Sequence, residues 1–85
     1  MNAPRFGYLV DGVDEAERQT RFRVLQALAL GICGPRAPLT ASFGKAINDP
    51  AAAETALALL VALPALRRRR LLASFSTLLP PGAKP

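Results

Sequence analysis

Histidine and tryptophan are absent from this 85-residue sequence, and cysteine occurs once, at Cys33. Without histidine the chain lacks the usual general base and the commonest metal ligand. A single cysteine excludes an intrachain disulfide and a cysteine metal cluster. Cys33 stands between apolar residues and glycines, where a buried, unreactive thiol is typical. We therefore expect no metal, no cofactor and a reducing, cytoplasmic location.

The residue combinations that are typical of enzymes are also missing. The serines Ser42, Ser74 and Ser76 have no histidine base to activate them. The glycines form neither a dinucleotide-binding fingerprint nor a P-loop. Acidic residues cluster within 11–17, but carboxylates are favoured at the start of a helix, which the same segment predicts. We expect a protein that is not an enzyme.

Long apolar runs are lacking as well. The uncharged segments 24–35 and 55–66 are twelve residues each, whereas a helix that spans a membrane needs about 20. The first residues show no apolar segment of the kind that signal peptides carry. A chain of this length has room for one core, so we expect a single small domain over residues 1–85.

Helix-forming residues make up much of what is present, because alanine and leucine are abundant and both favour helices. Apolar residues recur at helical spacing, and no strand-like alternation extends beyond residues 8–10. The sequence therefore predicts an all-α fold with a loose N-terminal arm and a frayed C-terminal tail. The expected ranges are three main helices of a small bundle at about 14–33, 50–63 and 65–79, a short helix near 40–47, the arm at 1–10 and the tail at 80–85.

Capping residues and prolines set the expected helix boundaries. Asp14 and Glu17 have the spacing of a capping box. Thr40 is expected to cap the short helix, while Asp49 followed by Pro50 indicates a further helix start. Pro64 interrupts the chain, either as a kink in one long helix or as a break between two.

Apolar faces predict which helices are buried. The helix at 50–63 is apolar on most sides, with only alanines and Thr55 covering the rest, which is typical of a central, buried helix. At 100° per residue, the helix at 65–79 has one apolar arc that is expected to face the core. This arc consists of Leu71, Leu72, Phe75, Leu78 and Leu79.

Positive charge is concentrated in four consecutive arginines, residues 67–70. The chain has eleven lysines and arginines against six acidic residues, a net charge of +5. Helical geometry directs Arg69 and Arg70 to solvent, places Arg67 at the border and projects Arg68 from the core side. Arg68 is therefore predicted either to extend to water or to pair with an acid. The helix dipole disfavours cations here by about 0.3–1 kcal/mol each.

These features predict a small interaction or regulatory protein that binds an acidic surface of a protein partner, by occlusion or bridging. Nucleic acid is the alternative partner, bound through phosphates with little sequence preference. A membrane surface is a third hypothesis, a second copy of the chain a fourth, and simple solvation of the helix competes with all of them. The residues expected to bind the partner are Arg67, Arg68, Arg69 and Arg70, with Arg18, Arg21 and Arg23 of the first helix as a second set.

Overall fold

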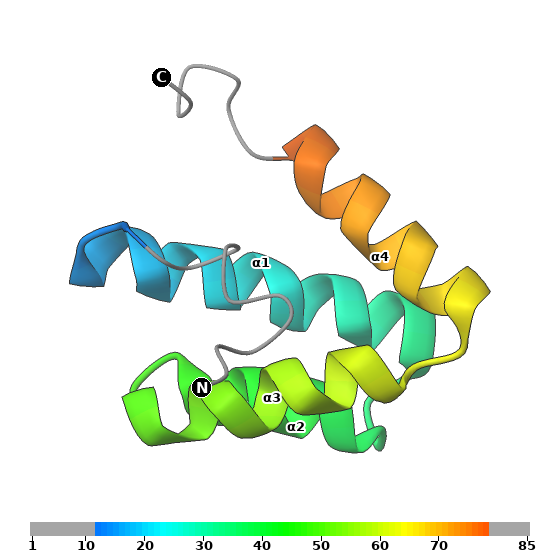
Figure 1. The fold of residues 1–85 in the computed structure, drawn as a ribbon, viewed down its shortest axis with the longest axis horizontal. Helices are drawn as coiled ribbons and strands as arrows, with labels where there is room; N and C mark the ends of the chain where they lie inside the picture. The colour runs from blue at the N-terminus through cyan, green and yellow to red at the C-terminus, as the bar shows by residue number, and fades with distance from the viewer. Residues whose placement is uncertain (1–11, 79–85) are drawn as a thin grey trace.

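Four helices make up most of residues 12–78, the part of the chain that the computed structural model describes (Figure 1). No strand occurs within these residues, so the all-α prediction is confirmed. The expected arm at 1–10, the tail at 80–85 and Leu79 lie outside the described residues. The helices are α1 (Glu15–Cys33), α2 (Pro38–Ala46), α3 (Pro50–Ala62) and α4 (Ala65–Leu78).

Side-chain caps start α1 and α3, as the sequence predicts. The Glu17 backbone N–H donates to Asp14 Oδ1 at 2.8 Å, and the Ala51 N–H donates to Asp49 Oδ1 at 3.0 Å. Each cap satisfies one of the N–H groups that have no partner within the first turn of a helix. Pro50 occupies the first position of α3, where its missing N–H costs nothing.

The start of α2 differs from the prediction. The helix begins at Pro38 with Ala37 as its N-cap residue, two positions earlier than expected. Thr40 is buried inside the helix, and its hydroxyl donates to the carbonyl oxygen of Gly34 at 2.8 Å. The prediction that Thr40 caps the helix is therefore wrong, because proline already provides a favourable first residue upstream.

Glycine ends α1, and a residue before proline ends α3. Gly34 has a φ of +99°, a conformation that favours glycine, and its N–H donates to the carbonyls of Ala29 and Leu30. Leu63 adopts an extended conformation with ψ of 150°, as expected for a residue before proline. Pro64 therefore separates α3 from α4 and does not kink one long helix.

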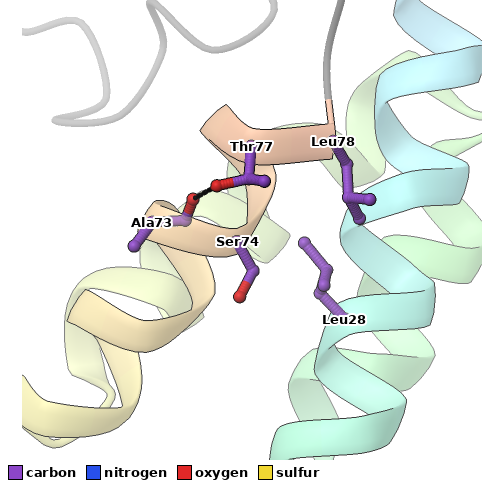
Figure 2. Close-up of a pocket in the computed structure, with 5 residues that line it drawn as sticks. All are labelled: Leu28, Ala73, Ser74, Thr77 and Leu78. Atoms are coloured by element: carbon purple, nitrogen blue, oxygen red, sulfur yellow. Dashed lines mark hydrogen bonds between the residues drawn. The ribbon is translucent and has the colours of Figure 1, made fainter.

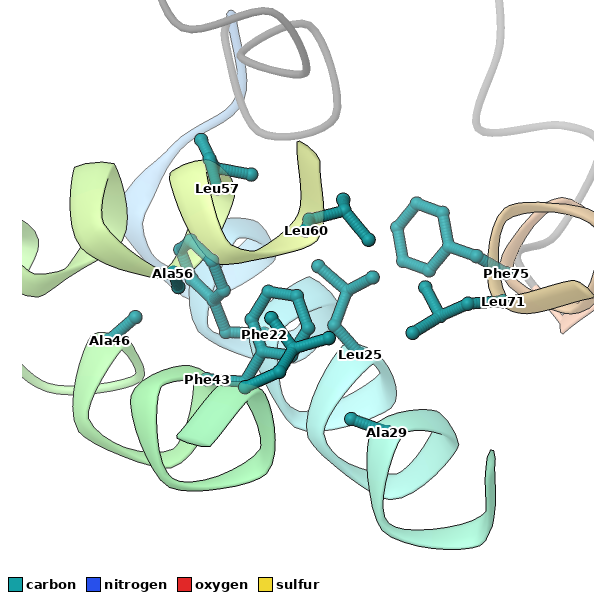
Figure 3. Close-up of a cluster of buried hydrophobic side chains, with 11 residues drawn as sticks. Phe22, Leu25, Ala29, Phe43, Ala46, Ala56, Leu57, Leu60, Leu71 and Phe75 are labelled. Atoms are coloured by element: carbon teal, nitrogen blue, oxygen red, sulfur yellow. The ribbon is translucent and has the colours of Figure 1, made fainter. Parts of the chain in front are cut away.

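The core forms where all four helices contribute side chains (Figure 3). α1 packs against both α2 and α4, while α3 packs mainly against α2. The Phe22 and Phe43 rings lie with their centroids 6.1 Å apart and join α1 to α2. The largest fully buried side chains are Phe22, Leu25, Phe43, Leu60 and Leu71.

Two predictions about burial are wrong. α3 is not a central, buried helix: it packs mainly against α2, whereas α1 and α2 each pack against two helices. It exposes Ala51, Ala58 and Ala62, and a small apolar side chain is tolerated in water. Leu78 was expected in the core but is 60% exposed. α4 crosses α1 at an angle, and its C-terminal end lies away from α1 (Figure 1).

Short connections make successive helices run in alternating directions (Figure 1). The starts of α1 and α3 therefore lie at one end of the molecule with the end of α2, and we call this the acidic end. The ends of α1 and α3 lie at the other with the starts of α2 and α4, and we call this the arginine end. No described helix has the length and hydropathy needed to cross a membrane.

Candidate interaction site at the arginine end

The carboxylates and the arginine run lie at opposite ends of the described chain, and we call this the separation of charge; Arg18 and Lys45 are basic side chains at the acidic end. Every carboxylate side chain within residues 12–78 lies at or near the start of α1 or α3. These positions are favourable because the N-terminus of a helix carries a partial positive charge. The carboxylates at the acidic end belong to Asp14, Glu15, Glu17, Asp49 and Glu54.

Arg18 is engaged within the acidic end. Its Nε and Nη2 donate to the two carboxylate oxygens of Glu15 at 3.0 and 2.7 Å, a bidentate pair. Its Nη1 donates to the Ala46 carbonyl at 2.9 Å, and its Nη2 approaches the Ile47 carbonyl at 3.4 Å. The guanidinium also lies over the Phe22 ring, 5.5 Å from its centroid. Arg18 therefore ties the start of α1 to the end of α2.

This arrangement shifts the ionisation of both partners. The hydrogen bond from Arg18 is the largest cause that lowers the pKa of Glu15 from its ordinary value of 4.5, and the same bond raises the pKa of Arg18. A lowered carboxyl pKa stabilises the fold above the ordinary pKa, and this stabilisation is lost as the pH falls through the lowered pKa. Glu15 is exposed to solvent, which keeps the effect small.

The other two arginines of α1 lie in different environments. Arg21 Nε donates to Glu17 Oε2 at 3.0 Å, and only 15% of the Arg21 side chain is exposed. Arg23 is exposed to solvent. Of the second basic set expected from the sequence, Arg18 and Arg21 are thus held in internal contacts, and Arg23 remains at the surface.

Arg68 caps the end of α3. Its Nη1 donates to the carbonyl oxygens of Val61 and Leu63 at 3.0 and 2.9 Å, and the side chain is half-buried. The predicted projection from the core side is confirmed, and the partners found within the described residues are backbone carbonyls, where the sequence predicts water or an acid. A cation is favourable at the C-terminus of a helix, where the dipole is negative. This contact offsets the unfavourable dipole at the start of α4.

The remaining arginines of the run are exposed. Arg67, Arg69 and Arg70 make no hydrogen bond or ion pair with any other described residue. Arg36, in the connection between α1 and α2, is exposed at the same end. No described carboxylate lies at the arginine end, so these cations lack an acidic partner within residues 12–78.

An apolar side chain accompanies these arginines. Leu66 is 72% exposed, the most exposed of the large apolar side chains in the described chain. Its spacing of three and four residues from Arg69 and Arg70 puts all three on one face of α4. Sequence reasoning missed Leu66, although counting 100° per residue places it opposite Phe75 and hence away from the core.

A groove of 260 Å³ opens at the arginine end beside Arg67. It forms where the end of α1, the start of α2, the end of α3 and the start of α4 meet. Its lining is apolar apart from one charged side chain, that of Arg67. No signal in the sequence indicates this groove, because four separate segments build it. The lining residues are Cys33, Ala37, Pro38, Leu39, Leu59, Ala62, Leu63, Pro64 and Arg67.

A second groove, of 370 Å³, lies between α1 and the C-terminal half of α4 (Figure 2). Leu28 and Leu78 provide apolar surface, while the Thr77 hydroxyl donates to the Ala73 carbonyl of its own helix at 3.0 Å. No charged side chain lines it. The arginine end, which combines charge with apolar surface, is therefore the better candidate for an interaction site.

Other kinds of site have less support in the described chain. No group of three metal-ligating side chains is found within residues 12–78. In the same residues, every buried side-chain nitrogen or oxygen has a hydrogen-bond partner. No family model matches the sequence, and no curated protein and no solved structure matches it either.

Proposed function

We propose that this chain is a small, non-catalytic interaction protein that binds an acidic segment of a partner protein at its arginine end. The separation of charge carries this proposal. Arg67, Arg69 and Arg70 are exposed together, while all described carboxylates lie at the opposite end. Guanidinium groups form bidentate hydrogen bonds with carboxylates, so an acidic segment complements this end. Such binding would act by occlusion or by bridging.

The apolar groups at the arginine end favour protein over nucleic acid as the partner. Binding to a phosphate backbone depends on positive charge and gains little from an exposed leucine. Protein interfaces instead combine arginine with buried apolar anchors. Leu66 and the neighbouring groove supply the apolar component. Nucleic acid, bound through the same arginines, is the competing outcome of the test below.

A reducing location fits the same proposal. With a single cysteine, which is half-buried at the end of α1, the chain has no disulfide to form within itself. We therefore propose a cytoplasmic regulator or adaptor.

A matched pair of charge variants tests the proposed function. R69Q/R70Q and R23Q/K45Q each remove two exposed positive charges and take the net charge from +5 to +3. The ligand is a random glutamate–tyrosine copolymer. R69Q/R70Q should weaken its binding by about 5- to 30-fold, because two exposed ion pairs with the copolymer are lost, at roughly 0.5–1 kcal/mol each. R23Q/K45Q should weaken it by about 2-fold or less, because its charges lie elsewhere.

Fluorescence anisotropy of the labelled copolymer at about 150 mM salt provides the measurement. Labelled duplex DNA of random sequence, measured in parallel, provides the comparison, and light scattering checks each variant for self-association. Tighter binding to DNA, with affinity falling steeply between about 50 and 200 mM salt, would favour the nucleic-acid alternative. Equal losses for the two variants, or no copolymer binding, would refute the proposed site.

A further inference from the structure

The groove at the arginine end has the size of a side-chain pocket. Its volume is 260 Å³, which exceeds the roughly 150 Å³ of a cavity that holds benzene. Sites for drug-sized ligands are typically larger, about 300–1,000 Å³, and bury most of the ligand. The groove is therefore better matched to one large side chain of a docked segment than to a free small molecule.

The chemistry of the lining indicates which kind of partner side chain the groove would bind. Leu39 of α2, Leu59 of α3 and Leu63, which follows α3 directly, provide apolar contacts. Arg67 is the only charged residue in the lining, is exposed, and has no partner among the described residues. An apolar group in the groove would therefore lie beside a free guanidinium, which favours a carboxylate close to that apolar group.

We infer that the groove binds a large apolar side chain of an acidic protein segment, while Arg67 binds a carboxylate adjacent to that side chain. The inference rests on the proposed function and specifies the partner: a leucine-, methionine- or phenylalanine-like residue next to aspartate or glutamate. Charge complementarity selects this occupant, since Arg36, Arg69 and Arg70 surround the same end without a described carboxylate.

Selection from a random peptide library displayed on phage, with the full chain as the target, tests this inference. Enriched peptides should carry a large apolar residue beside acidic residues. Cys33, the only cysteine in the sequence, lines the groove and reports its occupancy. A selected peptide at roughly ten times its Kd should slow alkylation of Cys33 by about 10-fold, as measured by mass spectrometry.

Two alanine substitutions on α3 provide the matched variants. Ala62 is exposed and lines the groove, so the larger side chain of Ala62→Phe should fill the groove. The affinity for the selected peptide should then fall by about 10- to 100-fold. Ala51 is also exposed on α3, eleven residues earlier and thus about 16 Å away, so Ala51→Phe should leave the affinity unchanged. Circular dichroism of both variants establishes that α3 is retained.

The outcomes separate this inference from the proposed function. One outcome is the selection of acidic peptides without an apolar preference, whose binding is weakened by R69Q/R70Q but not by Ala62→Phe. This result would overturn the inference that the groove is a docking site, and it would leave the proposed function standing. Peptides without acidic residues, or no enrichment, would overturn both. Apolar–acidic peptides that protect Cys33 and lose affinity with Ala62→Phe but not with Ala51→Phe would establish the groove as the docking site.

Discussion

Replacing Phe75 with alanine is expected to lower the free energy of unfolding by about 3–5 kcal/mol. Phe75 is 3% exposed, and with Leu71 it is one of the two buried side chains by which α4 joins the core. α4 packs mainly against α1, and among the described residues its hydrogen bonds to the end of α3 come from Arg68 alone, so Phe75 is a main anchor of this helix. Domains are stable by about 0.05–0.15 kcal/mol per residue, or roughly 4–13 kcal/mol for this chain. The substitution should therefore remove a large part of the total.

Urea unfolding followed by circular dichroism measures this loss, with Leu78→Ala as the control on the same helix. Leu78 is 60% exposed, so its truncation should change stability by less than about 0.5 kcal/mol. Amide hydrogen exchange in Phe75→Ala should be fastest in α4, because that helix loses its anchor. A loss below about 1 kcal/mol for Phe75→Ala would contradict the described packing of α4.

The second large effect is expected from Arg68→Met, which should cost about 1.5–3 kcal/mol of stability. Methionine keeps the apolar stem but removes the guanidinium that donates to the Val61 and Leu63 carbonyls at 3.0 and 2.9 Å. These carbonyls lie at the end of α3, where the loss of a cation is also unfavourable for the helix dipole. Arg68→Lys should recover part of the loss, because it restores a positive charge.

Arg69→Met is the matched control, since Arg69 is the next residue on the same helix and is exposed. Its effect on stability should stay within about 0.5 kcal/mol, measured by the same urea unfolding. Equal destabilisation by both substitutions would mean that the arginine run acts through general charge and that Arg68 has no special structural role. The two variants thus separate the structural role of Arg68 from the binding role that we propose for its exposed neighbours.

Much of the fold could be predicted from local signals in the sequence. The caps at Asp14 and Asp49 and the glycine at Gly34 each act within a few residues, so they can be predicted without tertiary information. Pro64 predicts an interruption, but the sequence does not decide between a kink and a break. The start of α2 at Pro38 could also be predicted from the sequence, because proline is favoured at the first helical position. The prediction of a cap at Thr40 overlooks this signal.

The arrangement of the helices could not be predicted in the same way. The side-chain pattern placed Arg68 on the core side but could not reveal that backbone carbonyls of the preceding helix would lie there. The exposure of Leu78 depends on the angle between α4 and α1, which no local rule sets. The groove beside Arg67 is built from four segments, so it exists only once they meet.

The separation of charge could be predicted in part from the sequence. Short connections usually join antiparallel helices, so acids at the starts of the first and third helices should lie at the end opposite Arg67–Arg70. The predicted helix boundaries, combined with the alternating direction of successive helices, therefore indicate the arginine end as the candidate site.

The central claim, that the arginine end is the binding surface, is tested most directly by residue-specific NMR of the labelled chain titrated with the glutamate–tyrosine copolymer. We predict that backbone amides of residues 33–39 and 59–70 shift or broaden first. Amides of residues 14–23 and 46–54, at the acidic end, should change little. Changes that are centred on the acidic end, or spread evenly over both ends, would contradict the proposed site.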